Sequence, residues 1–253
     1  MLENFWAGTA ESYVAYQANL EKANAALAAM ASDDEVDPFP PLYERDGSVG
    51  VVKIEGSLIP GEAGFYRFFG ITGYDDIKNA LIEAVSDREA KSIMLYCRSP
   101  GGSVEGVASC HDFIKVVAGV KPMNVYSEMA ASACYWISAA AGHITTTDTG
   151  INGSIGTVKV HMERSKMLDM DGIKVTVMRA GKFKMLANSY EPLTEEAKAQ
   201  EQIMLDDLYE AFASSVAEDR STTYAIADQV MGQGKVFMGK RGVEAGLVDA
   251  VGT

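Results

Sequence analysis

The stretch KSIMLYCRSPGGSVEG, residues 91–106, decides how this chain folds. Its first half is a nearly continuous apolar run, which is typical of a strand buried on both faces of a parallel sheet. Pro100 then fixes the backbone as the strand ends, and Gly101 and Gly102 allow a sharp turn with exposed N–H groups. The following residues, GSVEGVASCHDFIKVVAG (102–119), have helical spacing. The stretch therefore predicts a strand, a tight turn and a helix.

The same alternation of strand and helix continues on both sides of this stretch. Further strands are expected in VGVVKIEG (49–56), PMNVYSE (122–128), HITTTD (143–148), GTVKVHM (156–162) and IKVTVMR (173–179). Helices are expected over YDDIKNALIEAVSD (74–87), after residue 132, near 162–170 and over about 194–218. In the last of these, Thr194 is the predicted cap and the apolar stripe is Leu205, Leu208, Phe212 and Val216. Strands that alternate with helices predict an α/β domain with a mostly parallel sheet.

The N-terminal part has a different character. Residues 1–32 are expected to form a helical arm, with Thr9 as cap and a seam at Tyr13, Tyr16, Leu20, Ala23, Leu27 and Met30. The seam fits either packing on the chain's own domain or a contact between subunits. The acidic, proline-containing stretch 33–45 is expected to be a linker, and 46–253 the main domain.

Composition narrows the functional classes. The chain has 253 residues and a net charge of −13, so its bulk field repels nucleic acid and anionic membranes. Cys97, Cys110 and Cys134 form no CxxC pair and are expected to be reduced core residues. The histidines lack metal-ligand spacing, so neither a metal nor a cofactor is expected. The first residues, MLENFWAGTAESY, lack the features of a signal peptide, so we expect a cytoplasmic protein.

Four segments carry residues that packing alone does not require. They are RSPGGSVEG (98–106), EMAASACYWISAAAG (128–142), INGSIGTV (151–158) and RAGKFKMLANSYEP (179–192). Each has an ordinary explanation by itself: a glycine turn, Ser132 as a helix cap, a second turn, and surface lysines. Taken together they offer a serine nucleophile, a lysine base, a second hydroxyl and backbone N–H donors. No histidine occurs in any of the four, and a lysine can act as the base if burial lowers its pKa.

The ordered set SPGGSV, MAASACYWIS, NGSIGTV and RAGKFK resembles the signal peptide peptidase A family of Ser/Lys serine peptidases. The resemblance runs from about residue 48 to the end and includes VFMGKRGVEAGLVDAVG. Within that family the chain is more similar to bacteriophage head-maturation (capsid assembly) proteases, since it lacks a membrane anchor and has the length of one domain. The resemblance implies a ClpP/crotonase-like fold and a homo-oligomer.

The resemblance also assigns roles to residues. It implies that Ser132 is the nucleophile, Lys184 the general base and Ser154 the hydroxyl that orients the lysine. It implies an oxyanion hole made by the N–H groups of Gly102 and Ala133.

Two features of the chain leave alternatives open in this assignment of roles. Lys182 lies two residues from Lys184 and would share its face on an extended strand, so only the register decides between them. The family usually has two glycines after the nucleophile, whereas this chain has Ala133 and Cys134, whose side chains are expected to narrow the pocket.

The leading hypothesis is therefore an endopeptidase that cleaves scaffold or capsid proteins in an assembling phage head, in the host cytoplasm or procapsid interior. The same residues also fit a bacterial cytoplasmic peptidase that degrades signal peptides. An inactive ClpP/crotonase-like assembly protein and a crotonase-like CoA enzyme are the remaining alternatives. The CoA enzyme would use the oxyanion turn without needing Ser132 and Lys184 together.

Overall fold

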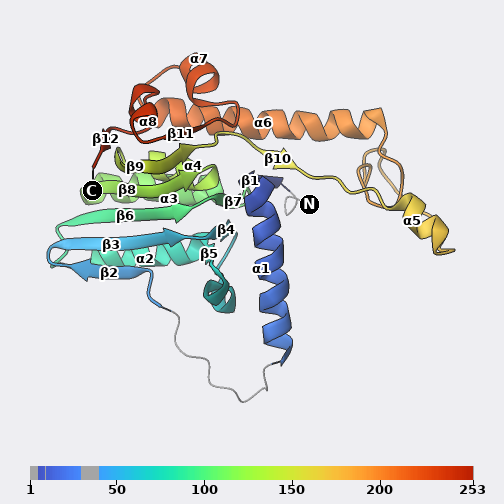
Figure 1. The fold of residues 1–253 in the computed structure, drawn as a ribbon, viewed down its shortest axis with the longest axis horizontal. Helices are drawn as coiled ribbons and strands as arrows, with labels where there is room; N and C mark the ends of the chain where they lie inside the picture. The colour runs from blue at the N-terminus through green and yellow to red at the C-terminus, as the bar shows by residue number, and fades with distance from the viewer. Residues whose placement is uncertain (1–4, 9, 30–39, 253) are drawn as a thin grey trace.

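The computed structural model describes residues 5–8, 10–29 and 40–252, and its centre is a large mixed sheet (Figure 1). The strand order is β11-β9-β8-β6-β3-β2, and β12 also pairs with β9. The pairs β3–β6, β6–β8, β8–β9 and β9–β12 are parallel, whereas β2 and β11 are antiparallel to their neighbours. The bounds are β2 Tyr43–Asp46, β3 Val49–Glu55, β6 Ser92–Ser99, β8 Met123–Ala131, β9 His143–Gly153, β11 Val236–Met238 and β12 Ala250–Val251. The predicted α/β class with a mostly parallel sheet is confirmed.

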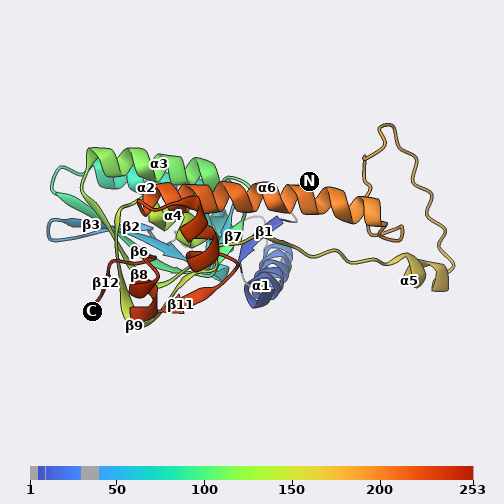
Figure 2. The same ribbon diagram turned by 90° about the horizontal axis from the view of Figure 1, so that it is seen from above.

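A layer of helices packs beside this sheet. The neighbours in the layer are α2 (Tyr74–Ser86), α3 (Val107–Val120), α4 (Ala133–Ala139) and α6 (Glu195–Asp219). Figure 2 shows α2 and α3 along the same side of the strands. The chain then closes with α7 (Tyr224–Ile226), the turn η3 (Ala227–Met231) and α8 (Lys240–Glu244). As predicted, Thr194 caps α6, since its Oγ1 accepts the N–H of Ala197 at 3.1 Å.

Burial along β6 differs from the expectation of a strand covered on both faces. Ile93, Leu95 and Cys97 are buried, while Met94 and Tyr96 between them are only half-buried. The helices cover one face of the sheet, so only alternate side chains lie in the core. On the other face Tyr96 stacks on Tyr126 with ring centroids 6.2 Å apart.

A smaller sheet lies at the carboxyl ends of the central strands. Its order is β10-β1-β7-β4-β5, with β1 Phe5–Gly8, β4 Ser57–Ile59, β5 Ile71–Gly73, β7 Gly101–Ser103 and β10 Val158–Lys159. The sequence missed β7, because residues 102–106 were expected to be helical. They are not, because residues 101–103 pair with β1 and β4, and α3 therefore begins only at Val107.

The N-terminal arm contains the helix expected after Thr9, α1 (Ala10–Ala29), which packs against the short 3₁₀ helix η2 (Gly64–Phe69). The strand β1 that precedes this helix was not expected. In the expected seam, Tyr13 and Tyr16 pack on Trp6 of the same arm, whereas Met30 lies outside the described residues, as does the cap Thr9. The expected linker 33–45 is too long by its last residues, because Tyr43–Asp46 pair with β3; residues 33–39 lie outside the described part.

Between β9 and α6 the chain leaves the main body and returns. We call residues 158–194 the extension; it contains β10 and α5 (Ser165–Met170), and beyond β10 it reaches away from both sheets (Figure 1). The helix near 162–170 is confirmed, but the strand predicted over 173–179 is not formed. A strand needs a neighbour for its N–H and C=O groups, and this segment pairs with no described part of the chain. Among the described residues, none of the helices has the length and apolarity to cross a bilayer.

Candidate active site

Ser132 stands in a strained backbone turn between β8 and α4. Its φ is 54° and its ψ −122°, a region that non-glycine residues rarely adopt and that costs about 1–3 kcal/mol. Two bonds hold the turn: the Ser132 N–H donates to the carbonyl of Gly153 at 2.7 Å, and its carbonyl accepts the N–H of Trp136 at 2.9 Å. Such strain persists only where the surrounding structure fixes it.

The side chain of Ser132 does not cap the helix. It makes no capping hydrogen bond, its exposed fraction is 1 %, and its Oγ has no hydrogen-bond partner among the described residues. An unpaired buried hydroxyl costs free energy, so nearly all such groups are paired in folded proteins. The ordinary explanation of a serine at this place, the N-cap, is therefore wrong for Ser132.

The glycine turn packs directly against the Ser132 turn. Gly101 has φ +98°, and a Cβ built on it would lie 2.1 Å from the Ala7 carbonyl oxygen and 2.9 Å from the Ala133 nitrogen. A Cβ on Gly102 would lie 2.0 Å from the carbonyl oxygen of Leu58 in β4. Only glycine fits at either position, and the expected oxyanion donors Gly102 and Ala133 lie on adjoining segments.

Ser99 fixes the glycine turn, a role that the sequence did not reveal. Its Oγ donates to the carbonyl of Gly56 at 2.6 Å and accepts the N–H of Gly101 at 3.1 Å. The only signal in the sequence is a serine at the end of an apolar strand, and its role becomes visible only once the Gly56 carbonyl on another loop is placed beside it.

Ser154 is joined to Ser132 through the backbone of its neighbour. The carbonyl that binds the Ser132 N–H belongs to Gly153, and Ser154 follows with φ 54°, nearly buried, its N–H donating to Lys235 O at 2.7 Å. Both serines thus occupy left-handed turns on neighbouring segments. The structure brings Ser132, Ser154 and the glycine turn together.

A buried polar network that the sequence also missed positions this segment. The Asn152 Oδ1 accepts from Ser127 Oγ at 2.7 Å, and its Nδ2 donates to Thr146 Oγ1 at 2.9 Å. Thr146 in turn donates to the Ser127 carbonyl at 2.8 Å. The network spans an irregularity in the β8–β9 pairing, after which Met129–Ala131 pair with Ile151–Gly153. It therefore fixes the register that places Gly153 opposite Ala131, beside Ser132.

The structure does not join Lys184 to Ser132 within one chain. Lys184 is exposed and lies on the extension, and the Ser132 Oγ is buried without a partner. Lys182 is exposed as well; its Nζ pairs with Glu196 at 2.5 Å and lies 5.1 Å from the centroid of the Phe183 ring. The expected shared strand face does not exist, because residues 180–187 form bends and turns instead of a strand.

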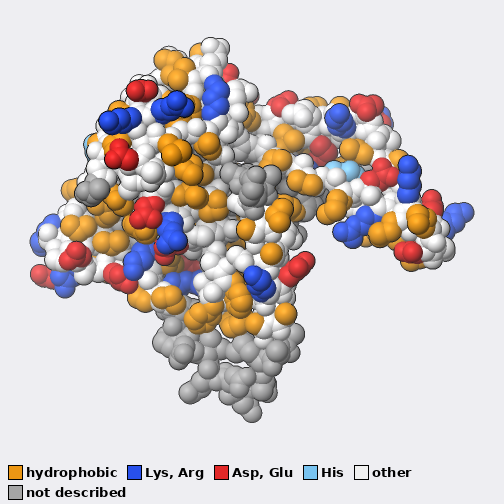
Figure 3. All heavy atoms as spheres, in the orientation of Figure 1, with side chains coloured by type: hydrophobic (Ala, Val, Ile, Leu, Met, Phe, Trp, Pro, Cys, Tyr) orange, Lys and Arg blue, Asp and Glu red, His pale blue; other side chains and the backbone are white. Residues whose placement is uncertain are grey.

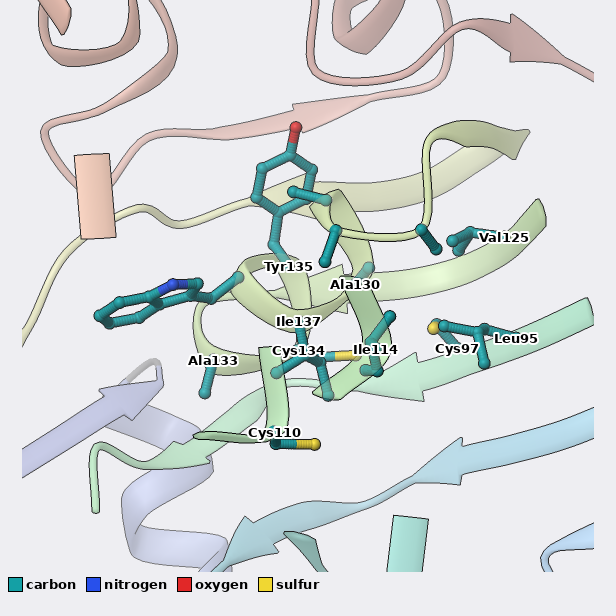
Figure 4. Packing of buried hydrophobic residues seen from close by; sticks show 14 of the residues in the cluster. Leu95, Cys97, Cys110, Ile114, Val125, Ala130, Ala133, Cys134, Tyr135 and Ile137 are labelled. Atoms are coloured by element: carbon teal, nitrogen blue, oxygen red, sulfur yellow. The ribbon is translucent and has the colours of Figure 1, made fainter. Parts of the chain in front are cut away.

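The cysteines are free and buried, as predicted. Contact with Cys97 and complete burial raise the pKa of Cys134 well above its usual value, so this thiol stays protonated and does not compete as a nucleophile. Figure 4 shows Cys134, Tyr135 and Ile137 of α4 among the buried residues of the core. Trp136 stacks on Phe212 of α6 at 4.5 Å, so the helix that carries the site is fixed to the longest helix.

Two of the three histidines are poorly placed to act as a base in lysine's stead. His111 of α3 bonds Asp112 through Nδ1 at 2.9 Å and Asp219 of α6 through Nε2 at 2.6 Å, so neither ring nitrogen is left to accept a serine proton. His143 is exposed at the start of β9, 3.8 Å from Asp249. Among the described residues, no cluster of His, Cys, Asp and Glu could hold a metal ion.

Comparison with known proteins matches two families. The profile of Peptidase family S49 matches residues 115–253, which include Ser132, Ser154 and Lys184, and that of Clp protease matches 72–148. The second match agrees with the ClpP-like α/β fold.

Curated relatives include proteins of phages and bacteria. The head-tail preconnector protein of Enterobacteria phage P21 is 31% identical over 210 residues, which are 82% of this chain and 41% of the relative. Capsid assembly protease C of Escherichia phage lambda is 28% identical over 225 residues, 88% of this chain and 51% of the relative. A putative signal peptide peptidase of Enterococcus faecium is 26% identical over 220 residues, 83% of this chain and 62% of the relative. The chain spans about half the length of the phage relatives it matches.

Proposed function

The chain belongs to peptidase family S49, and from this premise we propose that it is a serine endopeptidase with Ser132 as nucleophile. One observation carries the proposal: a buried serine hydroxyl without a partner, held in a strained turn against a glycine turn. Structural serines are paired, whereas a nucleophile must keep its oxygen available for a substrate carbonyl.

The geometry supports ordinary acyl transfer. The Ser132 Oγ attacks the carbonyl carbon of the scissile bond, and its proton passes to the base. The developing oxyanion accepts hydrogen bonds from the N–H groups of Ala133 and Gly102. The amine of the second fragment then leaves with the proton that the base took up. Water then hydrolyses the acyl-enzyme and restores Ser132.

We assign the base to Lys184 of a neighbouring copy of the chain. Lys184 lies on the extension, which leaves the body that carries Ser132, so one chain holds an incomplete site (Figure 1). Packing of the extension over a second body would bring the amine to the Ser132 turn and remove its water, which a lysine base requires. In this arrangement the Ser154 hydroxyl orients the amine.

The surface of the extension supports such a contact. Its large apolar side chains are exposed along its whole length, and hydrophobic groups are visible on it in Figure 3. They are Val158, Val160, Met162, Met167, Met170, Ile173, Val175, Met178, Phe183, Met185 and Tyr190. Apolar groups gathered on one projecting element mark an interaction site. The second copy would also supply the missing neighbour for residues 173–179 of the extension, so a strand there is expected only in the homo-oligomer.

Mixing two inactive variants tests the shared site. Ser132→Ala and Lys184→Ala should each lack activity on a peptide substrate, while Lys182→Ala should keep most of it. When the two inactive proteins are dissociated, mixed and reassembled, activity should return, because some sites then hold an intact serine from one copy and an intact lysine from the other. No recovery on mixing would place the base within one chain, and an active Lys184→Ala with an inactive Lys182→Ala would move the base to Lys182.

For the substrate, we propose scaffold and capsid proteins of an assembling phage head, in the host cytoplasm or procapsid interior. The support is the similarity to proteins named capsid assembly protease and head-tail preconnector. A peptidase acting on signal peptides is the second candidate, favoured by the similarity to a putative signal peptide peptidase. The two candidates are distinguished by incubating the enzyme with capsid and scaffold proteins, and separately with signal peptides, and identifying the fragments by mass spectrometry. If the enzyme can be acylated at Ser132 but cleaves neither kind of substrate, both candidates are contradicted.

A further inference from the structure

The first described strand of the chain lies inside the candidate site. β1 (Phe5–Gly8) sits between β7, the strand of the glycine turn, and β10 of the extension (Figure 1). It is antiparallel to both, with Ala7 opposite Gly102 and Gly8 opposite Gly101 on one side, and Trp6 opposite Val158 on the other. A peptide that adds a strand to a sheet edge is a common mode of peptide binding.

The register of β1 places a carbonyl group at the site. A Cβ on Gly101 would lie 2.1 Å from the Ala7 oxygen, and the same Cβ would lie 2.9 Å from the Ala133 nitrogen. The Ala7 carbonyl therefore lies beside the turn that carries the oxyanion donors. A substrate must present the carbonyl that is attacked at this place.

The side chains of β1 fit as those of a bound peptide would. Ala7 is completely buried and belongs to the main core cluster, together with Leu58 and Ala133. The methyl group of Ala7 fills the space available to the side chain at this position. With β1 in place, the exposed fraction of Ser132 is 1 %, so a second peptide cannot reach the nucleophile.

Contacts within the arm hold β1 in the groove. The Trp6 indole Nε1 donates to Ser12 Oγ at 3.1 Å, and the ring stacks on Tyr16 at 4.9 Å and meets Tyr13 edge-on at 5.5 Å. Helix α1 is tied to the body in turn, since Tyr66 donates to the Asn24 side chain at 2.9 Å. The strand and its helix thus dock as a unit.

We propose that β1 occupies the substrate groove of its own chain in the orientation of a substrate, with Ala7 in the place of the residue whose carbonyl is attacked. Protein substrates enter by displacing β1. The groove accordingly takes an extended peptide with a small residue such as alanine at that place, because Ala7 leaves no space for a larger side chain. This inference rests on the proposed function, since it uses Ser132 as the nucleophile.

The first test weakens β1 in the full chain and follows the acylation site. The probe is a peptidyl diphenyl phosphonate with an alanine side chain at its reactive position, and the readout is the rate of Ser132 labelling by mass spectrometry. Ala7→Trp cannot fit the closed position, so labelling should accelerate about tenfold or more, as the fraction of open grooves rises. The matched control is Ala25→Trp, which changes an exposed alanine of α1 and should label at the wild-type rate.

The outcomes separate the two proposals. If Ala7→Trp labels Ser132 no faster than the wild type does, β1 does not block the groove, and Ser132 remains the nucleophile. If no variant labels at Ser132, the proposed function fails and this inference with it. A probe with a phenylalanine side chain should label more slowly than the alanine probe in Ala7→Trp; equal rates would overturn the assignment of a small subsite.

A second test does not depend on how Ala7→Trp folds. Phe5 of β1 is opposite Lys159 of β10, so Phe5→Cys with Lys159→Cys places two thiols across an antiparallel pair. The disulfide should lock β1 in the groove and slow Ser132 labelling about tenfold or more relative to the same protein after reduction. Equal labelling in the oxidised and reduced forms would overturn the inference.

Discussion

Replacing Gly102 by alanine tests the site at the point where the backbone is most crowded. A Cβ on Gly102 would lie 2.0 Å from the carbonyl oxygen and 2.5 Å from the nitrogen of Leu58. Both are backbone atoms of β4, so no side chain can turn aside to make room.

The expected size of the effect follows from that distance. Contacts of a Cβ below about 3.0 Å do not persist, so β7 and β4 must separate by about 1 Å. A displacement of about 1 Å near reacting groups costs about 10²-fold in rate, and loss of one oxyanion donor costs about 10²–10³-fold. We therefore expect kcat/KM to fall by about 10²–10³-fold in Gly102→Ala.

The assay combines peptide hydrolysis with thermal unfolding of the same preparations. Gly119→Ala is the matched control, because a Cβ there meets nothing within 4 Å and φ is not positive. Alanine should stabilise α3 at that position by about 0.5–1 kcal/mol and leave activity unchanged. Gly102→Ala should remain folded at the assay temperature.

The reasoning is refuted if Gly102→Ala hydrolyses the peptide at a rate within a factor of about three of the wild type. That result would mean either that β4 yields without moving the Gly102 N–H or that this N–H does not bind the oxyanion. An equal loss of activity in the control Gly119→Ala would also refute the reasoning, because the effect would then not depend on the contact with β4.

Three further outcomes are expected. Ser154→Ala should lower kcat/KM by less than about 10²-fold, because it removes an orienting hydroxyl and leaves the base; a loss as complete as that of the nucleophile variant would show a larger role. Burial alone would lower the pKa of His111, but the hydrogen bonds to Asp219 and Asp112 raise it overall. The stability that protonated His111 contributes to the fold is therefore complete below about pH 6.5 and is lost as pH rises through the raised pKa. Urea unfolding from pH 6 to 9 should show this decline in the wild type and not in His111→Gln. Phe212→Ala, which removes the buried ring stacked on Trp136 of α4, should lower the free energy of unfolding by about 3–5 kcal/mol, measured by urea denaturation; a cost below about 1 kcal/mol would contradict the packing.

Much of the fold was predictable because its signals are local. Apolar runs such as residues 92–98 and the capped, striped helix that begins after Thr194 are recognised from neighbouring residues alone. The boundaries of β7 and β2 were missed, since residues 101–103 and 43–46 become strands only by pairing with segments distant in sequence. β1 was missed for the same reason.

The sequence by itself determined which chemical groups the chain carries and their order: a glycine pair after a strand, a serine before a helix, a second serine between glycines, and two lysines. Only the tertiary structure decided how they meet. It placed Ser132, Gly102 and Ser154 on adjoining turns, left Lys184 on a projecting segment, and laid residues 5–8 across the site. The physical reason is that residue type fixes what a group can do chemically, whereas the meeting of groups requires pairing and packing between segments far apart in the chain, and no local pattern records those contacts.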